Sequence, residues 1–467
     1  MKYETKLMLL KYIGNVILLI VQVGLFSCLW FFHYISLLAD LGRGFYYWGY
    51  WAVIGLYLLF VVFFTKNFDG YKSEFRRGKR TALNHIISVI CANGVGVIQI
   101  WIIARYYFSV VPIIFLTAVQ ILFILGWAFL MKKIYMSTNK RQGLLVIYDS
   151  YSPNVFLEKD TNIHEMYTVN RILNLNFNEG NNQYIYEEIQ KNDVILLYEI
   201  PSEIRNNILK YCYSNKKNVL ITPKISDILI SGGEELSFID KPLLFIESRG
   251  LRVESLFLKR CSDIILALLA IVITSPLILI FAALIKLYDR GKVFYTQERI
   301  TIDELPFQII KFRSMVEDSE DEGARLAQQN DSRITPIGRF LRATHLDELP
   351  QIFNILRGEM SFVGPRPERR EIADEYEKII PEFKYRTTVK AGLTGYAQVY
   401  GKYNTPPYDK LRLDLKYIEN YSIGLDFKLI LMTLKIMFQR DNTEGVDINQ
   451  KNAIQNSKVE SIKIKEE

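Results

Sequence analysis

Cysteine and histidine are scarce, with four of each among 467 residues. The cysteines show no CxxC spacing, and two of them lie in apolar runs where a thiol usually packs as a small hydrophobic group. The histidines stand singly, and only His345 lies near a pair of carboxylates. These absences argue against a disulfide framework, a zinc site or a histidine-based metal centre.

Long apolar runs are abundant, and they dominate the first third of the chain. Four runs approach the ~20 residues that a helix needs to cross the hydrocarbon core of a bilayer. They span approximately Tyr12–Phe32, Tyr46–Thr65, Ile86–Phe108 and Val110–Met131. A cleaved signal peptide does not fit the first run, because no small-residue cleavage site follows it and three more runs do. We therefore predict a four-helix transmembrane region over residues 1–143.

The positions of the basic residues predict the orientation of these helices. Six lysines and arginines lie between the second and third runs, and four more follow the fourth run, whereas the loop after the first run carries one arginine. The positive-inside rule then places the N-terminus, the loop from 66 to 85 and everything after Met131 in the cytoplasm. The net charge of +7 fits this placement of charge, and we expect no nucleic-acid partner.

Residues 144–251 change to short apolar runs separated by polar stretches. Three runs predict buried parallel strands: Leu144–Tyr148, Val194–Tyr198 and Val219–Thr222, with a crossover helix over Glu203–Lys216. The turn after the first strand lacks the glycines of a GxGxxG motif, which a dinucleotide site needs for close approach of the pyrophosphate. We predict a Rossmann-like α/β domain with a structural or regulatory role; nucleotide binding is the alternative.

A fifth apolar run, residues 264–287, has basic residues at both ends. Both ends therefore favour the cytoplasmic face. Ser275 and Pro276 stand in its middle, where proline removes a helical hydrogen bond and a hydroxyl can satisfy the freed carbonyl. We predict a re-entrant helix that breaks here and returns to the same side. A kinked spanning helix is the alternative.

The region after Lys286 reads as a mixed α/β domain, to about residue 447. Two short strands are expected over Phe294–Arg299 and Phe307–Met315, and their period of two places Lys311 and Arg313 on one face, as suits a diphosphate. A solvated edge strand is the alternative. Helical spacing over Leu425–Phe438 fits an interfacial or a core-facing helix, and we expect the polar tail at 448–467 to be disordered.

Asp347 and Glu348 stand side by side in Leu346-Asp347-Glu348-Leu349-Pro350. Thr344 and Asp347 have capping-box spacing, and Gly358 supplies a helix stop, so we predict that the pair lies at a helix N-terminus. Arg342 lies just upstream and could contact phosphate. Adjacent carboxylates point in different directions and therefore suit different roles. A surface capping pair is the alternative.

Leu258–Arg440 closely resembles the bacterial sugar transferase family, the monotopic polyprenyl-phosphate phosphoglycosyl transferases. The matching motifs are Lys259-Arg260-Cys261-Ser262-Asp263, Ser275-Pro276, Lys311-Phe312-Arg313-Ser314-Met315, Leu346 to Gln351, Ser361-Phe362-Val363-Gly364-Pro365-Arg366-Pro367 and Gly392 to Val399. The N-terminal regions are similar to those of extended members such as undecaprenyl-phosphate glucose or galactose phosphotransferases. One departure is Ala391, where the family usually has proline, and it makes the rigidity of that loop less certain.

The resemblance implies transfer of a sugar-1-phosphate from a UDP-sugar to undecaprenyl phosphate, which starts capsule, exopolysaccharide or O-antigen synthesis. Asp347 would be the nucleophile, Glu348 the ligand of a Mg²⁺ cofactor, and Lys311, Arg342 and Arg366 the phosphate contacts. The loop with Gly392, Thr394, Gly395 and Gln398 would face the nucleotide.

The same resemblance places the protein in the bacterial inner membrane with a cytoplasmic catalytic domain. Its expected partners are the two substrates and the lipid bilayer, and a homodimer or polysaccharide assembly proteins would be further ones. An inactive membrane scaffold or nucleotide sensor is the alternative function, and the intact Asp347, Glu348 and Arg366 speak against it. A polytopic transferase would need about ten spanning helices. No residue identifies the sugar.

Overall fold

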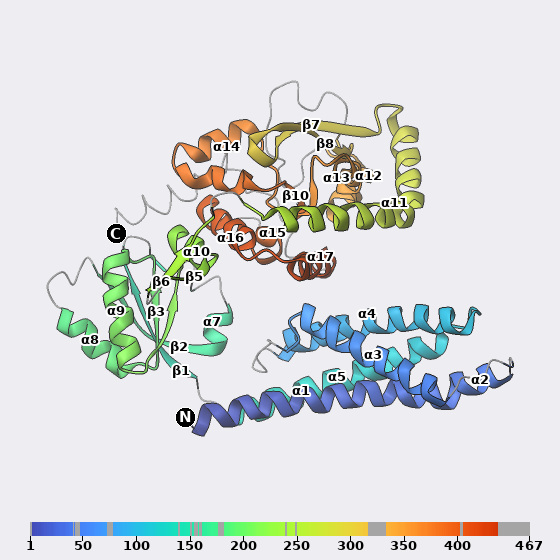
Figure 1. Ribbon diagram of the computed structural model, residues 1–467, viewed down its shortest axis with the longest axis horizontal. Coiled ribbons are helices and arrows are strands. Elements are labelled where there is room, and N and C mark those ends of the chain that lie inside the picture. Colours follow the sequence, from blue (N-terminus) through green and yellow to red (C-terminus); the bar gives the residue numbers. More distant parts are fainter. Residues whose placement is uncertain are drawn as a thin grey trace. The chain divides into compact units, whose positions relative to one another are not determined.

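The computed structural model describes residues 2–437, with gaps. The gaps are 41, 43–46, 72–77, 139–140, 150–151, 154–156, 158–160, 176–181, 239–240, 248–249, 316–332 and 402–404. The predicted disordered tail at 448–467 lies outside the described residues. Two compact units, Met1–Thr222 and Pro223–Glu467, make up the chain (Figure 1).

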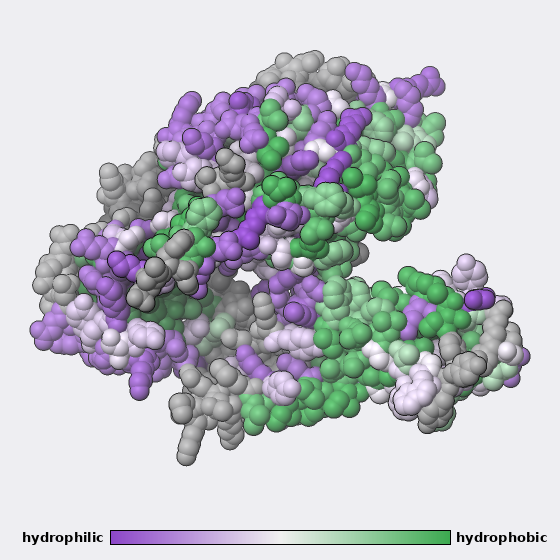
Figure 2. All heavy atoms as spheres, in the orientation of Figure 1, coloured by the Kyte–Doolittle hydropathy of each residue, from purple (hydrophilic) through white to green (hydrophobic). Residues whose placement is uncertain are grey.

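The first unit begins with long apolar helices. They are α1 (Lys2–Leu29), which continues through a π-helical turn at Trp30–Tyr34 into α2 (Ile35–Asp40), then α3 (Tyr47–Asn67), α4 (Gly78–Ala104) and α5 (Val111–Thr138). Hydrophobic side chains gather over these helices in Figure 2. Four helical stretches here are long and apolar enough to cross a membrane, which confirms the predicted set of apolar helices near the N-terminus.

A buried polar network joins four of these helices. The Tyr57 hydroxyl donates to Asn93 Oδ1 at 2.6 Å, and Asn93 Nδ2 donates to Thr117 Oγ1 and Gln120 Oε1, both at 2.8 Å. Gln120 Nε2 in turn donates to the backbone oxygen of Gln22 at 3.1 Å. Each polar group satisfies another, so α1, α3, α4 and α5 are joined by hydrogen bonds as well as by apolar packing.

The α/β region has a four-stranded parallel sheet in the order β2-β1-β3-β4. Its strands are β1 (Gln142–Tyr148), β2 (Tyr167–Asn174), β3 (Val194–Tyr198) and β4 (Asn218–Ile221), and its helices are α7 (Thr161–Met166), α8 (Asn182–Lys191) and α9 (Ser202–Ser214). The three predicted strands and the crossover helix are confirmed in position. The predicted burial of the third strand is wrong, because β4 is an edge strand with no buried residue. Strand β2 was not predicted, because it is an edge strand in which half of the residues are exposed and only Leu173 is buried.

The second unit starts with α10 (Ile225–Ser231) and the hairpin β5 (Glu234–Phe238) and β6 (Lys241–Phe245). Ile225 and Ile228 of α10 are buried in one core with Leu411, Leu415 and Leu429 from the end of the chain. The compact units therefore divide at residue 222, inside the stretch 144–251 that the sequence groups as one domain.

Helix α11 (Val253–Asp289) contains Pro276 in its interior and bends sharply along its length (Figure 1). An α-helix would pair the N–H of residue 276 with the carbonyl of Val272, and proline has no N–H to give. The Ser275 hydroxyl donates to Val272 O at 3.1 Å, and Thr274 Oγ1 donates to Ala270 O at 2.7 Å. The Ser275 hydroxyl thus satisfies the carbonyl that Pro276 leaves without its helical partner.

The remaining elements form the body of the second unit. They are β7 (Phe294–Ile300), η4 (Ile302–Glu304), β8 (Pro306–Phe312), α12 (Pro336–Ala343), η5 (Leu346–Glu348), α13 (Gln351–Arg357), β9 (Ser361–Val363), α14 (Arg370–Glu377), η6 (Pro381–Thr388), β10 (Gly392–Thr394), α15 (Tyr396–Tyr400), α16 (Pro407–Glu419) and α17 (Ile423–Met437). Strands β7 and β8 lie where two short strands were predicted, although β8 ends at Phe312 and not at Met315. They pair antiparallel, and β9 pairs parallel with β10. Helix α17 buries Leu429 and Met432, so one of its faces packs on the core.

Candidate active site

Asp347 and Glu348 lie on a 3-10 turn between α12 and α13. The predicted capping box is wrong, because Thr344 ends α12 and its hydroxyl donates backwards to Phe340 O at 2.8 Å. The N-cap of α12 is Thr335, whose Oγ1 accepts from the Gly338 N–H. The pair is instead held by a short rigid turn that continues through Pro350 into α13, and Gly358 ends α13 as predicted, with a φ of 85°.

Glu348 binds two cations from different parts of the chain. Its Oε1 accepts from Lys311 Nζ on β8 at 2.7 Å and from Arg366 Nη2 in the loop after β9 at 3.0 Å. The carboxylate is 15% exposed. Burial raises its pKa, but Arg366 and Lys311 outweigh burial and hold the pKa well below its ordinary value. Glu348 is therefore ionised at neutral pH.

Asp347 behaves differently from its neighbour. Burial and the adjacent Glu348 charge raise the pKa of Asp347, while Lys311, Arg342 and His345 oppose that rise. Two adjacent carboxyl groups thus have pKa values pushed apart by their surroundings, a pattern found where such groups take different chemical roles. The cationic side chains near Asp347 are those that could also neutralise a phosphate oxygen.

The predicted phosphate-binding cations only partly converge. Lys311 and Arg366 meet at Glu348, and Arg342 at the end of α12 lies close enough to Asp347 to lower its pKa. Arg313 lies beyond the end of β8, is buried, and lines a small cavity with Ile285 and Tyr288 of α11. The prediction that Lys311 and Arg313 lie together on one face is therefore wrong, and the cation that lies beside Lys311 at Glu348 is Arg366.

The glycine loop after β10 packs directly on the loop that carries Arg366. A Cβ at Gly392 would collide with the backbone nitrogen of Gly364, and one at Gly395 would collide with the backbone oxygen of Gly364. The Gly364 N–H donates to Thr394 O at 2.9 Å. Only glycine permits this approach of two backbones.

Thr394 and Gln398 of the same loop point inward. The Thr394 hydroxyl pairs with the Thr433 hydroxyl of α17, and Gln398 Nε2 donates to Leu393 O at 3.1 Å. Their role toward a nucleotide stays a prediction.

Sequence reasoning missed a buried charged network behind Arg366. Arg386 donates to the backbone oxygen of Arg366 at 2.9 Å, pairs with Asp414 at 2.9 Å and lies 3.5 Å from Glu368. A small cavity lined by Arg366, Glu368 and Arg386 lies beside it. The available signal was Asp414, which falls on the buried stripe of α16 between Leu411 and Ile418.

The donor set near Glu348 fits a cation that substrate phosphates help to bind. Among the described residues no group of three or more acidic, histidine or cysteine side chains forms a complete metal cage. Mg²⁺ commonly takes one or two carboxylates together with phosphate oxygens and water. Both cationic contacts of Glu348 go to Oε1, and within the described chain no hydrogen bond reaches Oε2, so one carboxylate oxygen remains as a ligand atom.

Comparison with known proteins matches this unit to a family. The family model described as bacterial sugar transferase matches residues 254–440. The N-acetylgalactosaminephosphotransferase acting on undecaprenyl phosphate from Aeromonas hydrophila is 43% identical over 182 residues, which cover 38% of this chain and 43% of the relative. The UDP-glucose:undecaprenyl-phosphate glucose-1-phosphate transferase of Klebsiella pneumoniae is 38% identical over 224 residues, covering 46% of this chain and 48% of the relative.

The match thus spans about half the length of these two relatives. The enzyme with the same UDP-glucose name from Caulobacter vibrioides is 39% identical over 189 residues, which cover 39% of this chain and 71% of the relative. The family model and this coverage agree. The chain belongs to the bacterial sugar transferase family.

Proposed function

We propose that this protein transfers a sugar-1-phosphate from a UDP-sugar to undecaprenyl phosphate, forming undecaprenyl-diphosphate-sugar and UMP. The observation that carries the proposal is the Asp347–Glu348 turn, where Lys311 and Arg366 converge on one carboxylate and leave its neighbour with a raised pKa. The names of the relatives support the same two substrates. The reaction would begin the assembly of a capsule, an exopolysaccharide or an O-antigen.

The chemistry divides into two steps. A carboxylate oxygen of Asp347 bonds to the sugar-bearing phosphorus, and the bond from that phosphorus to the bridging oxygen breaks, so UMP leaves with the bond electrons. An oxygen of undecaprenyl phosphate then attacks the same phosphorus and displaces Asp347, which is regenerated as a carboxylate. A covalent sugar-phosphate intermediate predicts ping-pong kinetics.

The surrounding charges suit this route. Phosphoryl transfer depends mainly on positioning and on neutralising negative charge, and Arg342, Lys311 and Arg366 would supply cationic contacts to the diphosphate. Glu348 would hold Mg²⁺, which when bound supplies further charge neutralisation. The loop with Gly392 and Gly395 would then lie on the nucleotide side of the site.

The membrane arrangement follows from the acceptor. Undecaprenyl phosphate keeps its phosphate at the membrane interface, so the carboxylates must work at headgroup depth on the side that contains UDP-sugar. A re-entrant α11, bent at Ser275 and Pro276, would hold them there, with the catalytic unit on the cytoplasmic side of the inner membrane. The bend and the hydroxyl bond to Val272 O support this topology over a straight span.

Topology can be tested by cysteine labelling. In a background without the four native cysteines, a cysteine placed just after Leu287 should react with an impermeant maleimide only from the cytoplasmic side. Labelling from the outside would show that α11 crosses the membrane. A cysteine in the α3–α4 loop is the matched cytoplasmic control.

The activity test is UMP release over a panel of UDP-sugars with undecaprenyl phosphate in detergent micelles, beside Asp347→Asn. The wild type should release UMP with at least one sugar, and the variant should lose at least about 10³-fold, because an amide is a poor nucleophile. An Asn variant with near wild-type turnover would eliminate the covalent route. A wild type that binds UDP-sugar without releasing UMP would favour the sensor or scaffold alternative.

We also propose that the protein forms a homodimer and contacts polysaccharide assembly proteins. The α/β region would have a regulatory or structural role. Glucose, galactose and N-acetylated or diamino sugars all remain candidate donors, and the panel is designed to distinguish them.

A further inference from the structure

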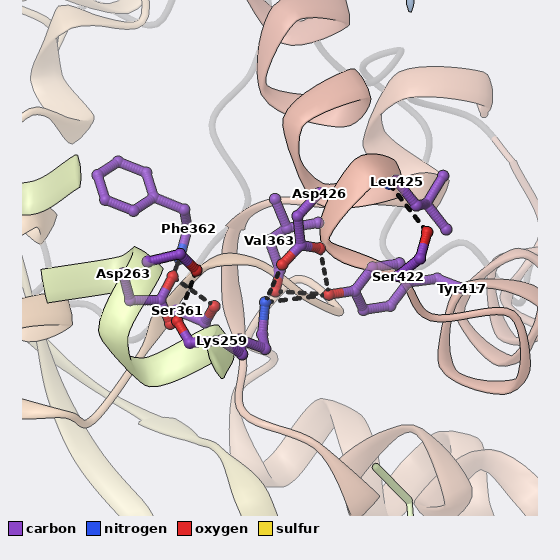
Figure 3. A network of polar contacts seen from close by, with 10 residues as sticks. Lys259, Asp263, Ser361, Phe362, Val363, Tyr417, Ser422, Leu425 and Asp426 are labelled. Atoms are coloured by element: carbon purple, nitrogen blue, oxygen red, sulfur yellow. Dashed lines mark hydrogen bonds and ion pairs between the residues drawn. The ribbon is translucent and has the colours of Figure 1, made fainter. Parts of the chain in front are cut away.

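The first polar turn of α11 contacts both segments that frame Glu348. Arg260 donates to the carbonyls of Ile355 and Leu356 at 2.7 Å each, and these carbonyls lie in the last turn of α13. One turn later, Asp263 Oδ1 accepts from Ser361 Oγ and from the Phe362 N–H, both at 3.0 Å. Figure 3 shows Asp263 facing Ser361 and Phe362.

Strand β9 is held from its other side as well. The Tyr417 hydroxyl lies 3.2 Å from Val363 O and donates to Asp426 Oδ1 at 2.8 Å. Lys259 of α11 pairs with Asp426 at 2.7 Å, as Figure 3 shows. Asp263 is 4% exposed and Lys259 5%, so these contacts are shielded from water and strongly directional.

Only two residues separate the end of β9 from Arg366. Gly364 and Pro365 give this link little freedom, because Gly364 is packed against the glycine loop and proline fixes its own φ. A displacement of β9 therefore moves the Arg366 guanidinium relative to Glu348. The carboxylate of Asp263 has no other described connection to the Asp347–Glu348 turn.

We propose that Asp263 is a positioning residue, which acts through β9 to hold Arg366 against Glu348, while Arg260 holds the opposite segment through α13. The inference rests on the proposed function for its kinetic readout. It also assigns a role to the Lys259-Arg260-Cys261-Ser262-Asp263 motif: the membrane helix and the catalytic turn share one set of buried hydrogen bonds.

A double-mutant cycle tests the inference with the full chain in micelles. Asp263→Ala should lower kcat/KM for UMP release about 10²-fold, because small misplacements of a charged contact are costly. In an Arg366→Lys background the same change should cost less than roughly threefold, since the contact it positions is already impaired. Asp263→Asn retains an oxygen acceptor and should recover most of the lost rate.

Asp227→Ala is the matched control. Asp227 also accepts a backbone N–H, that of Lys224 at 2.8 Å, but it lies on α10. The fold loss in kcat/KM caused by Asp227→Ala should be the same in the wild-type and the Arg366→Lys backgrounds, because the two residues act independently. Equal fold losses for Asp263→Ala in both backgrounds would overturn the inference. If Asp263→Ala does not fold, Ser361→Ala carries the same cycle with a smaller effect.

Hydrogen exchange gives a readout that does not need activity. Peptides covering residues 361–367 should exchange faster in Asp263→Ala than in Asp227→Ala, because the Phe362 N–H loses its acceptor. Unchanged exchange there would overturn the inference even in an active enzyme. A wild type without UMP release would instead count against the proposed function, with the exchange result still deciding the role of Asp263.

Discussion

Ala391 is held in place by a hydrogen bond at a position where the family usually has a proline ring. The family resemblance leads one to expect proline here, which would fix the backbone by its ring. Ala391 instead donates its N–H to the Thr301 hydroxyl at 3.1 Å, and Thr301 donates onward to Glu359 O at 2.8 Å. A hydrogen bond that proline cannot form thus anchors the start of the glycine loop.

Ala391→Pro should therefore destabilise this protein by about 1 kcal/mol, the usual worth of a buried hydrogen bond. Thermal unfolding in micelles would measure the change. In a Thr301→Val background the substitution should cost less, because no hydroxyl acceptor remains. A raised melting temperature in the wild-type background would mean that ring rigidity outweighs the hydrogen bond.

Asp414 should make stability depend on pH. Burial, with Glu368 adding to it, raises the pKa of Asp414 from 3.8 to about 6, against the opposing charges of Arg386 and Lys410. The folded protein then holds a proton that the unfolded chain releases near pH 4. This contribution to stability is complete below pH 3.8 and is lost as pH rises through 6.

Between pH 5 and 7.5 the folding stability of the wild type should fall by about 1 kcal/mol relative to that of Asp414→Asn, which has no proton to release. Unfolding of both proteins at the two pH values would measure this difference. A stability gap that stays constant with pH would show that Arg386 keeps Asp414 ionised throughout.

At the scale of elements, apolar runs predicted the structure best. Strands β1 and β3 are continuous apolar runs that the parallel sheet buries, and they were placed within two residues. Strand β4 was placed equally well, but it lies at the sheet edge and has no buried residue. Strand β2 could not be found this way, because it lies at the sheet edge and only Leu173 of its residues is buried. The Thr344 capping box failed because a threonine hydroxyl serves equally well at the end of a helix, where it bonds backwards.

The sequence predicted which charged residues form the candidate site, but not the residues that hold them in position. Asp347, Glu348 and Arg366 are charged residues in recognisable sequence motifs. The residues that hold them in place contact them from distant parts of the chain, and no pattern of neighbouring residues reveals such contacts. Asp263 lies 98 positions from Ser361, and no local pattern links them. Asp414 is the exception, since a carboxylate on an apolar helical stripe signals a buried partner.

The polar network among the N-terminal helices offers a test at the same scale. Asn93 joins α4 to Tyr57 of α3 and to Thr117 and Gln120 of α5. Asn93→Leu should destabilise the first unit by about 1–2 kcal/mol, because hydrogen bonds between membrane helices contribute roughly 0.6 kcal/mol each and removal leaves buried partners unpaired. Thermal unfolding of the full chain, with Asn67→Leu at an exposed helix end as control, would measure it.

Equal melting temperatures for Asn93→Leu and the control would show that apolar packing alone holds these helices together.

At the scale of the whole molecule, the second unit has its own core and contains the entire family match. The match to the Caulobacter relative covers 71% of that relative's length but only 39% of this chain. A fragment beginning at Pro223 should therefore retain UMP release in micelles. A fragment beginning at Arg252 should be clearly less stable, because it lacks Ile225 and Ile228 of the core.

Melting temperature and UMP release, measured for both fragments, would show whether α10 is needed for the stability of the second unit. Ile228→Ala in the longer fragment should move its stability toward that of the shorter one. Equal stability of both fragments would show that α10 contributes nothing to the second unit.

The contact among Gly364, Gly392 and Gly395 limits which residues of this protein can vary. The two loops touch through their backbones, with no side chain between them. Their spacing therefore cannot be adjusted by exchanging one side chain for a slightly larger or smaller one. A side chain at any of the three glycines would force the two loops apart. We therefore expect sequence variation at the residues around this contact and not at the glycines themselves.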